Sequence, residues 1–170
     1  MLGFLLAGGR AHRFGADKAM HLVDGVPMAL RVYTSMREAG LEVVAVAKDR
    51  RLEELGIPCL VEPDKPRHPL VGVVLGLGEG GGVFAPCDVP WIPPQAFVQL
   101  AEAPGSIARD EGGLHPLLAH YPEDWLERAQ ELLSRRRPAR ALADGAQFLD
   151  LPAAWLRNVN RVEDLGPRQR

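Results

Sequence analysis

Residues 5–18 read Leu5-Leu6-Ala7-Gly8-Gly9-Arg10-Ala11-His12-Arg13-Phe14-Gly15-Ala16-Asp17-Lys18 and follow the first apolar run of the chain. The apolar run from Met1 to Leu6 is short enough to be a buried strand. Glycines directly after such a strand let the backbone turn sharply and bring its N–H groups close to phosphate oxygens. Arg10, Arg13 and Lys18 add positive charge to the same loop. The stretch therefore predicts a sheet whose first strand ends in a loop for a nucleoside triphosphate.

This loop does not match the common phosphate-binding loops. The spacing of Gly15 and Lys18, with no Ser or Thr after the lysine, excludes a Walker A sequence, and no GxGxxG pattern is present. Taken alone, Gly8 and Gly9 are equally compatible with an ordinary turn beside solvated basic side chains. Lys18 favours the phosphate site, because arginine is otherwise the usual cation of this chain and a compact ammonium suits a point contact with phosphate. A coding bias toward arginine is the alternative explanation for the composition, and under it the lysine at position 18 occurs by chance.

Composition limits the class of protein. A chain of 170 residues, 46% hydrophobic and 25% charged, fits one globular domain over residues 1–170. The net charge of −2 gives no indication of a nucleic-acid or anionic-membrane partner. No leader sequence and no apolar run of roughly 20 residues is evident, so we expect a cytoplasmic protein with no nucleic-acid and no membrane partner. Cys59 and Cys87 lie in separate apolar segments without metal-ligand spacing, which favours two buried thiols.

Strand and helix patterns alternate along the chain. Apolar runs between turn signals predict strands at residues 1–6, 41–47, 58–61, 83–86, 105–110, 114–121, 147–151 and 155–159. Helical spacing predicts helices at 28–39, 49–55, 70–77, 93–103, 122–133, around 139 and at 162–165. This order predicts an α/β protein with a mainly parallel sheet covered on both faces, and residues 105–121 form a hairpin added to that sheet.

A single aspartate marks a second candidate site. Asp88 follows the apolar run that ends at Pro86, so we expect it at the carboxyl edge of the sheet, where open α/β sheets bind ligands. Magnesium takes oxygen ligands and usually one or two carboxylates plus substrate phosphates. Asp88 is therefore predicted to hold Mg²⁺ opposite the phosphate loop, with a turn-capping aspartate before Pro90 as the alternative.

Several motifs occur in an order that runs from one terminus nearly to the other. They are Leu6-Ala7-Gly8-Gly9, Arg13-Phe14-Gly15, Asp17-Lys18, Pro69-Leu70-Val71-Gly72, Cys87-Asp88-Val89-Pro90, His115-Pro116 and Asn158-Val159-Asn160. On these motifs the chain resembles the molybdenum cofactor guanylyltransferases, within the nucleotidyltransferase superfamily. The first motif and the Cys87 motif are shared with nucleotidyltransferases that act on sugars and other phosphates. The two asparagines and His115-Pro116 are more particular to the family.

The resemblance implies a three-layer α/β/α, Rossmann-like nucleotidyltransferase fold with a mainly parallel, mixed sheet. It also implies transfer of GMP from GTP to molybdopterin with release of pyrophosphate. A molybdenum-insertion protein or an acceptor molybdoenzyme is the implied protein partner. The residues implied for each role are, for the nucleotide, Leu6, Ala7, Gly8, Gly9, Lys18, Asp64 and Asp88; for Mg²⁺, Asp88; for catalysis, Arg13, Lys18 and Asp88; and for the pterin substrate, His115, Asn158 and Asn160.

Some features depart from the family or leave alternatives open. The family's asparagine after the second strand has no match near residues 47–49, and His68 stands where the family usually has glycine. Asn158 and Asn160, two apart on a predicted strand, would face one side; a pair of turn or cap residues is the alternative. The basic run Arg135–Arg140 favours a solvated helix end. Cytidylyl transfer, transfer to a sugar phosphate, and a non-catalytic nucleotide-binding accessory protein are the alternative functions.

Overall fold

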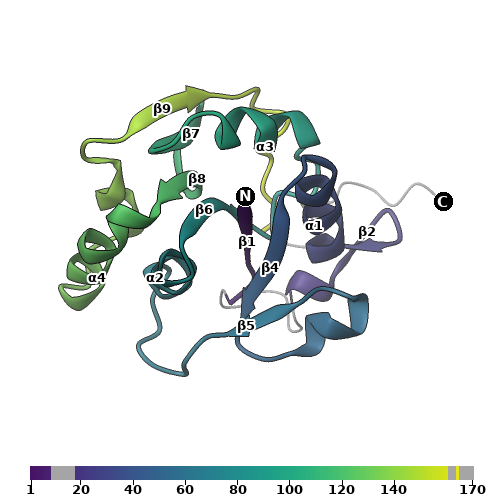
Figure 1. Cartoon of the computed structure of the whole chain (residues 1–170). Coiled ribbons are helices and arrows are strands. Elements are labelled where there is room, and N and C mark those ends of the chain that lie inside the picture. The colour runs from purple at the N-terminus through teal and green to yellow at the C-terminus, as the bar shows by residue number, and fades with distance from the viewer. Residues whose placement is uncertain (9–17, 161–163, 165–170) are drawn as a thin grey trace.

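The computed structural model describes residues 1–8, 18–160 and 164. A seven-stranded sheet with the order β5-β4-β1-β6-β8-β7-β9 forms the middle of the molecule (Figure 1). Its strands are β1 (Leu2–Leu6), β4 (Glu42–Ala47), β5 (Cys59–Val61), β6 (Gly81–Pro86), β7 (Ser106–Asp110), β8 (Gly113–Pro122) and β9 (Gln147–Asp150). Neighbouring strands are parallel except where β8 pairs with β6 and β7. A separate two-stranded sheet joins β2 (Leu22–Val23) and β3 (Val26–Pro27).

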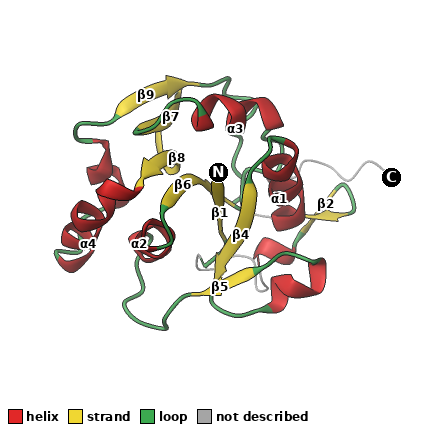
Figure 2. Cartoon of the chain, viewed as in Figure 1, coloured by secondary structure: helices red, strands yellow, loops and turns green. Residues whose placement is uncertain are grey.

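Helices cover both faces of the large sheet (Figure 2). The α-helices are α1 (Met28–Glu38), α2 (Leu70–Gly78), α3 (Pro94–Ala101) and α4 (Leu126–Ser134). Short 3₁₀ turns are η1 (Lys18–Met20), η2 (Arg51–Leu55), η3 (Glu123–Trp125) and η4 (Ala139–Ala143). Helices α1 and α3 pack into one hydrophobic core, and α2 and α4 pack into the other. The predicted three-layer α/β/α fold with a mixed, mainly parallel sheet is confirmed.

The first strand shows why its apolar run is continuous. Successive side chains of a strand point to opposite faces, and Leu5 packs into the core under α1 and α3, whereas Phe4 and Leu6 pack into the core under α2 and α4. Phe4 stacks on Phe84 of β6 with ring centroids 4.8 Å apart. A central strand covered on both faces needs apolar residues on both sides, so no polar alternation is seen.

Three predicted elements differ from the structure. The predicted helix at residues 49–55 is only the 3₁₀ turn η2, which the left-handed Gly56 (φ 75°) ends, and the predicted helix around residue 139 is likewise the 3₁₀ turn η4. The predicted strand at 155–159 is wrong: Trp155 and Leu156 form turns back to Pro152 and Ala153. Beyond that turn a backbone bond, from the Val159 N–H to the Asp88 carbonyl, ties the segment to the body of the protein. Of the predicted last helix, only residue 164 lies within the described residues.

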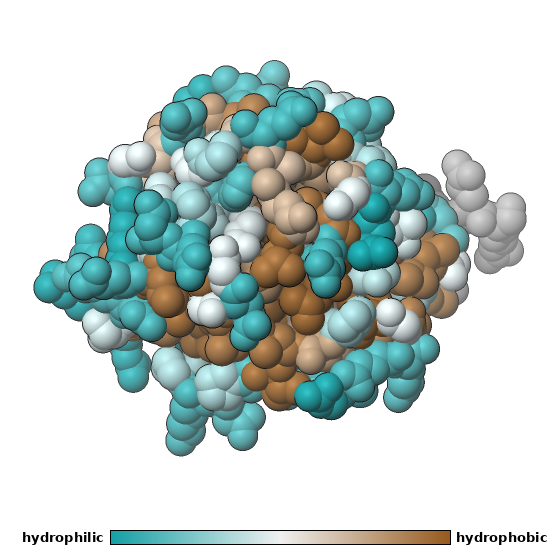
Figure 3. All heavy atoms as spheres, viewed as in Figure 1, coloured by the Kyte–Doolittle hydropathy of each residue, from teal (hydrophilic) through white to brown (hydrophobic). Residues whose placement is uncertain are grey.

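The surface is mixed. Figure 3 shows apolar side chains in the middle of the face viewed in Figure 1, with polar side chains around them. The most exposed large apolar side chains are Met1, Leu22, Val61, Val98 and Phe148. Within the described parts of the chain, every helix is too short or too polar to cross a bilayer.

Candidate active site

A cavity of about 660 Å³ opens at the carboxyl ends of the parallel strands β1, β4, β5 and β6. This is the edge at which open α/β sheets bind ligands, and the volume lies in the range of small-molecule sites, about 300–1,000 Å³. The residues that line it are Leu6, Ala7, Gly8, Lys18, Lys48, Glu62, Asp64, Arg67, His68, Pro69, Pro86, Cys87, Asp88 and Leu117. Six of the predicted nucleotide-binding residues line this cavity: Leu6, Ala7, Gly8, Lys18, Asp64 and Asp88.

The loop after β1 is held by backbone bonds on both sides. The Ala7 N–H donates to the Val46 carbonyl at 2.8 Å, and the Cys87 N–H donates to the Leu6 carbonyl at 3.1 Å. These bonds continue the ladders that β1 makes with β4 and β6 past the end of the strand. The loop therefore enters the cavity from a fixed position between the two neighbouring strands.

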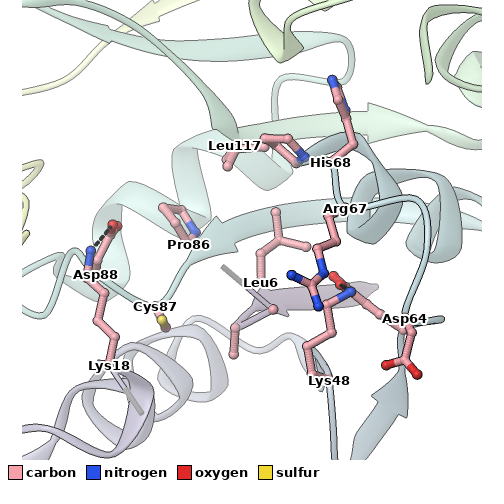
Figure 4. Close-up of a pocket in the computed structure, with 14 residues that line it drawn as sticks. Leu6, Lys18, Lys48, Asp64, Arg67, His68, Pro86, Cys87, Asp88 and Leu117 are labelled. Carbon is pink, nitrogen blue, oxygen red and sulfur yellow. Dashed lines mark hydrogen bonds and ion pairs between the residues drawn. The ribbon is translucent and has the colours of Figure 1, made fainter. Parts of the chain in front are cut away.

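An ion pair occupies one end of the cavity (Figure 4). Lys18 begins η1, and its Nζ lies 2.8 Å from Asp88 Oδ2, with both side chains about one-fifth exposed. The same Nζ donates to Asn160 Oδ1 at 3.0 Å. Lys18, Asp88 and Asn160, which come from three distant parts of the sequence, thus meet at one point.

Asp88 has the chemistry of a cation ligand. Its Oδ1 is buried and makes no hydrogen bond within the described residues, although buried polar atoms are nearly always paired. The Asp88 carbonyl accepts from the Val159 N–H, which fixes the backbone on which the carboxylate stands. No group of three or more His, Cys, Asp or Glu side chains suited to a metal is found in residues 1–8 and 18–160. Asp88 thus presents one buried, unpaired carboxylate oxygen at this end of the cavity.

The other end of the cavity holds a second ion pair, which sequence reasoning missed. Lys48 directly follows β4, Glu62 directly follows β5, and Lys48 Nζ lies 2.8 Å from Glu62 Oε2. Lys48 also donates to the Pro63 carbonyl at 2.9 Å. Two signals in the sequence could have found this pair: Lys48 is one of only three lysines, and both residues follow adjacent predicted strands at the ligand-binding edge.

The loop between β5 and α2 contributes further polar residues to that end. Figure 4 draws Lys48, Asp64 and Arg67 on one side of Leu6, and Lys18 and Asp88 on the other. Asp64 is exposed, and its carboxylate points away from Lys48 in this view.

His68 fixes the start of α2. Its Nδ1 accepts from the Leu70 N–H at 3.1 Å, which satisfies one of the backbone donors at the start of the helix.

Four other predicted site residues lie elsewhere or outside the described residues. His115 stands on β8 outside the cavity lining, and its Nε2 is 3.1 Å from Asp110 Oδ1. Burial raises the pKa of Asp110, but the interactions with His115 and the Gly112 N–H outweigh it and hold that pKa below its usual value. Asn158 is exposed and is absent from the cavity lining. Gly9 and Arg13 lie outside the described residues.

The basic run at the end of α4 is a surface feature. Arg135 pairs with Glu131 one turn earlier at 2.8 Å. Arg135, Arg136, Arg137 and Arg140 are all exposed, and none lines the cavity. This placement agrees with the predicted solvated helix end.

Comparisons with known proteins place this architecture in a family. A molybdenum cofactor guanylyltransferase of Burkholderia vietnamiensis is 39% identical over 112 residues, which cover 59% of this chain and 55% of that protein. A probable molybdenum cofactor guanylyltransferase of Thermococcus gammatolerans is 33% identical over 188 aligned residues, covering 98% of this chain and 97% of that protein. The crystal structure of molybdopterin-guanine dinucleotide biosynthesis protein A from Archaeoglobus fulgidus superimposes with a TM-score of 0.78 at 20% identity, covering 97% of this chain and 95% of that one. The family model for the MobA-like NTP transferase domain matches residues 3–150. The chain belongs to the MobA-like NTP transferase family.

Proposed function

We propose that this protein transfers GMP from GTP to molybdopterin and releases pyrophosphate. Membership of the NTP transferase family supports the reaction class, and the names of the curated relatives support the substrates. The observation that carries the proposal is the meeting of Lys18, Asp88 and Asn160 at one end of a cavity that also holds the loop after β1.

The reaction asks mainly for positioning and charge from the protein. A phosphate oxygen of molybdopterin forms a bond to the α-phosphorus of GTP, the bond between the α-phosphorus and the bridging oxygen breaks, and pyrophosphate leaves in line. A phosphate monoester is already largely ionised at neutral pH, so no general base is needed. In agreement with this, the described residues that line the cavity include no serine or threonine.

The chain's residues divide this work between them. Lys18 contributes a fixed positive charge and two directed contacts, and fixed charges of this kind stabilise the charge of the transferring phosphate. The backbone of Leu6, Ala7 and Gly8 contributes to the nucleotide site from the end of β1, and Gly9 and Arg13 keep their predicted roles in nucleotide binding and catalysis. Asp88 holds Mg²⁺, through the oxygen that is otherwise unpaired. When bound, that ion offsets the charge on the phosphate oxygens.

The remaining predicted contacts complete the substrate sites. Asp64 contributes to the nucleotide site from the loop before α2. Asn160, next to Lys18, binds the pterin substrate together with Asn158 and His115, because an amide offers both donor and acceptor. His115 lies on β8, the strand that also contributes Leu117 to the cavity lining. The proposed product is handed to a molybdenum-insertion protein or a molybdoenzyme in the cytoplasm.

The test is the substitution Asp88→Asn, which keeps the shape of the side chain and removes its charge. We expect transfer of GMP to molybdopterin to fall on the order of 10²–10³-fold at saturating GTP, the usual cost of losing one group that stabilises transition-state charge. Pyrophosphate release and product formation would be measured at several Mg²⁺ concentrations.

The matched control is Asp144→Asn, which removes one carboxylate from an exposed position outside the cavity. It should transfer GMP at the rate of the unchanged protein. Thermal melts of both variants check that the fold is retained. Full transfer activity of Asp88→Asn would overturn the proposed role of this carboxylate.

A further inference from the structure

The pair Lys48–Glu62 is built by the register of two adjacent strands. Ala47 of β4 is aligned with Val61 of β5 in a parallel ladder, and the Glu62 N–H donates to the Ala47 carbonyl at 2.8 Å. Lys48 and Glu62 are the next residues along the two strands, so their side chains leave neighbouring positions at the cavity edge. The sheet itself therefore places one ammonium beside one carboxylate.

The carboxylate lies in a close-fitting cradle of two glycines. A Cβ on Gly8 would lie 2.5 Å from both Glu62 oxygens, and a Cβ on Gly72 would lie 3.0 Å from Oε1. The Glu62 side chain is only 8% exposed. Within the described residues Lys48 is the one side chain recorded as a partner of this carboxylate, which leaves further lone pairs free to accept.

Each end of the cavity holds one ammonium and one carboxylate, so charge alone does not distinguish the two ends. The proposed function places Mg²⁺, and with it the phosphates, at the unpaired Asp88 Oδ1, and the apolar side chain of Leu6 stands between the two ends (Figure 4). The Glu62 carboxylate at the other end is left to accept hydrogen bonds from N–H groups. A nucleotide with its phosphates at Lys18 would therefore extend its base toward Glu62 and Lys48.

The hydrogen-bonding pattern of the pair matches one base. The edge of guanine carries an acceptor, O6, next to two adjacent donors, N1–H and N2–H₂. A carboxylate accepts from two adjacent donors at once, and the neighbouring ammonium donates to O6. Cytosine carries one donor and two acceptors on the same edge, so one of its acceptors would face a carboxylate oxygen.

We infer that Glu62 and Lys48 determine the base specificity of this protein, with Glu62 accepting from N1–H and N2–H₂ of guanine and Lys48 donating to O6. The inference rests on the proposed function and adds the residues that select GTP.

A first experiment uses the unchanged protein. Binding of GTP, inosine triphosphate, xanthosine triphosphate and CTP would be measured by calorimetry with Mg²⁺ and without molybdopterin. Inosine lacks the 2-amino donor and xanthine replaces it with an acceptor, so both should bind on the order of 10- to 100-fold more weakly than GTP. CTP should bind at least as weakly.

A second experiment reverses the preference. Glu62→Gln keeps one oxygen to accept from N1–H and places an NH₂ donor opposite position 2. The variant should lose on the order of 10- to 100-fold in GTP affinity and gain affinity for xanthosine triphosphate. A merely structural ion pair would produce no such gain.

The matched control is Glu42→Gln, which makes the same charge change at the opposite, exposed end of β4. It should leave all nucleotide affinities unchanged. A second variant, Lys48→Met, removes the donor to O6, which guanine and xanthine share, and should weaken both without changing their ratio. If Glu62→Gln does not fold, Lys48→Met and the analogue series still decide the matter.

The outcomes separate this inference from the proposed function. An unchanged ratio of GTP to xanthosine triphosphate in Glu62→Gln, or equal binding of GTP and xanthosine triphosphate by the unchanged protein, overturns the inference alone. The predicted switch in base preference without transfer to molybdopterin would overturn the proposed function alone. Absence of any GTP binding by the unchanged protein would overturn both.

Discussion

Gly8→Ala tests how closely the loop after β1 is packed on the base-binding end of the cavity. The added Cβ would lie 2.5 Å from both carboxylate oxygens of Glu62, whereas ordinary contact begins at 3.4 Å. The carboxylate or the loop must therefore shift by about 0.9 Å to restore normal contact. Glu62 is buried and bonded to Lys48 at 2.8 Å, so that shift works against an existing ion pair.

Two quantities should change together. Forcing one extra methyl group into a packed site costs about 1–3 kcal/mol of unfolding free energy. A displacement of roughly 1 Å at a substrate-positioning group can cost up to about 100-fold in rate, so we expect kcat/KM for GTP to fall by about 10- to 100-fold. Urea unfolding and steady-state pyrophosphate release measure the two effects on the same protein preparation.

Gly78→Ala is the matched control, because it makes the same change at the exposed end of α2. A Cβ there would meet nothing within 4 Å. Alanine is favoured over glycine in a helix by about 1 kcal/mol, so this variant should be as stable as the unchanged protein or slightly more stable, with normal kinetics. Unchanged stability and unchanged GTP kinetics in Gly8→Ala would refute the packing argument.

Two further predictions concern residues outside the cavity lining. Tyr121→Phe removes the hydrogen bond from a buried hydroxyl to the Pro116 carbonyl (2.7 Å) and should lower the unfolding free energy by about 1 kcal/mol in urea denaturation; an unchanged midpoint would contradict this. Burial raises the pKa of the Cys59 thiol, and the charge of Glu53 adds to the effect, so alkylation of Cys59 followed by peptide mass mapping should be slower at pH 8 than for a free thiol and should accelerate only above the ordinary thiol pKa. Alkylation at the free-thiol rate at pH 8 would show that the raised pKa is wrong.

The strands of the sheet could be predicted because the residues at their ends mark where each apolar run stops. The run from Leu2 to Leu6 is apolar on both sides and stops at glycine, and Gly81–Pro86 stops before Cys87-Asp88. The hairpin of β7 and β8 was also expected, since a glycine-containing turn separates two strand patterns. Such local patterns determine which residues form strands, and parallel order then follows from the alternation with helices.

The segment at residues 155–159 shows where local pattern fails. Leu156 and Val159 are buried three residues apart, and the chain turns at Trp155. A strand needs a ladder of backbone hydrogen bonds to a neighbouring strand. In the described part of this segment, the backbone bond to another strand's end is the one from the Val159 N–H to the Asp88 carbonyl, which does not make a ladder. The segment needs no strand to place Asn160 beside Lys18, because the bond from the Val159 N–H to the Asp88 carbonyl already holds it at the site.

The burial of Glu62 is the part of the site that local sequence patterns do not show. It results from contact with Gly8 and Gly72, which are 54 and 10 residues away in the sequence. The family resemblance favoured Asp64, two residues later, as the carboxylate of this loop. The structure shows that Glu62 is buried and that Asp64 is exposed.

The most direct test of the central claim is formation of the dinucleotide product by the unchanged protein. Molybdopterin, Mg²⁺ and either GTP or CTP would be incubated with the protein, and both pyrophosphate and the product mass would be measured, with a chelator as control. We expect GTP to yield molybdopterin-guanine dinucleotide and pyrophosphate in equal amounts, and the chelator to stop the reaction. A guanine product that never forms, or a cytosine product formed in preference to it, would contradict the proposed function.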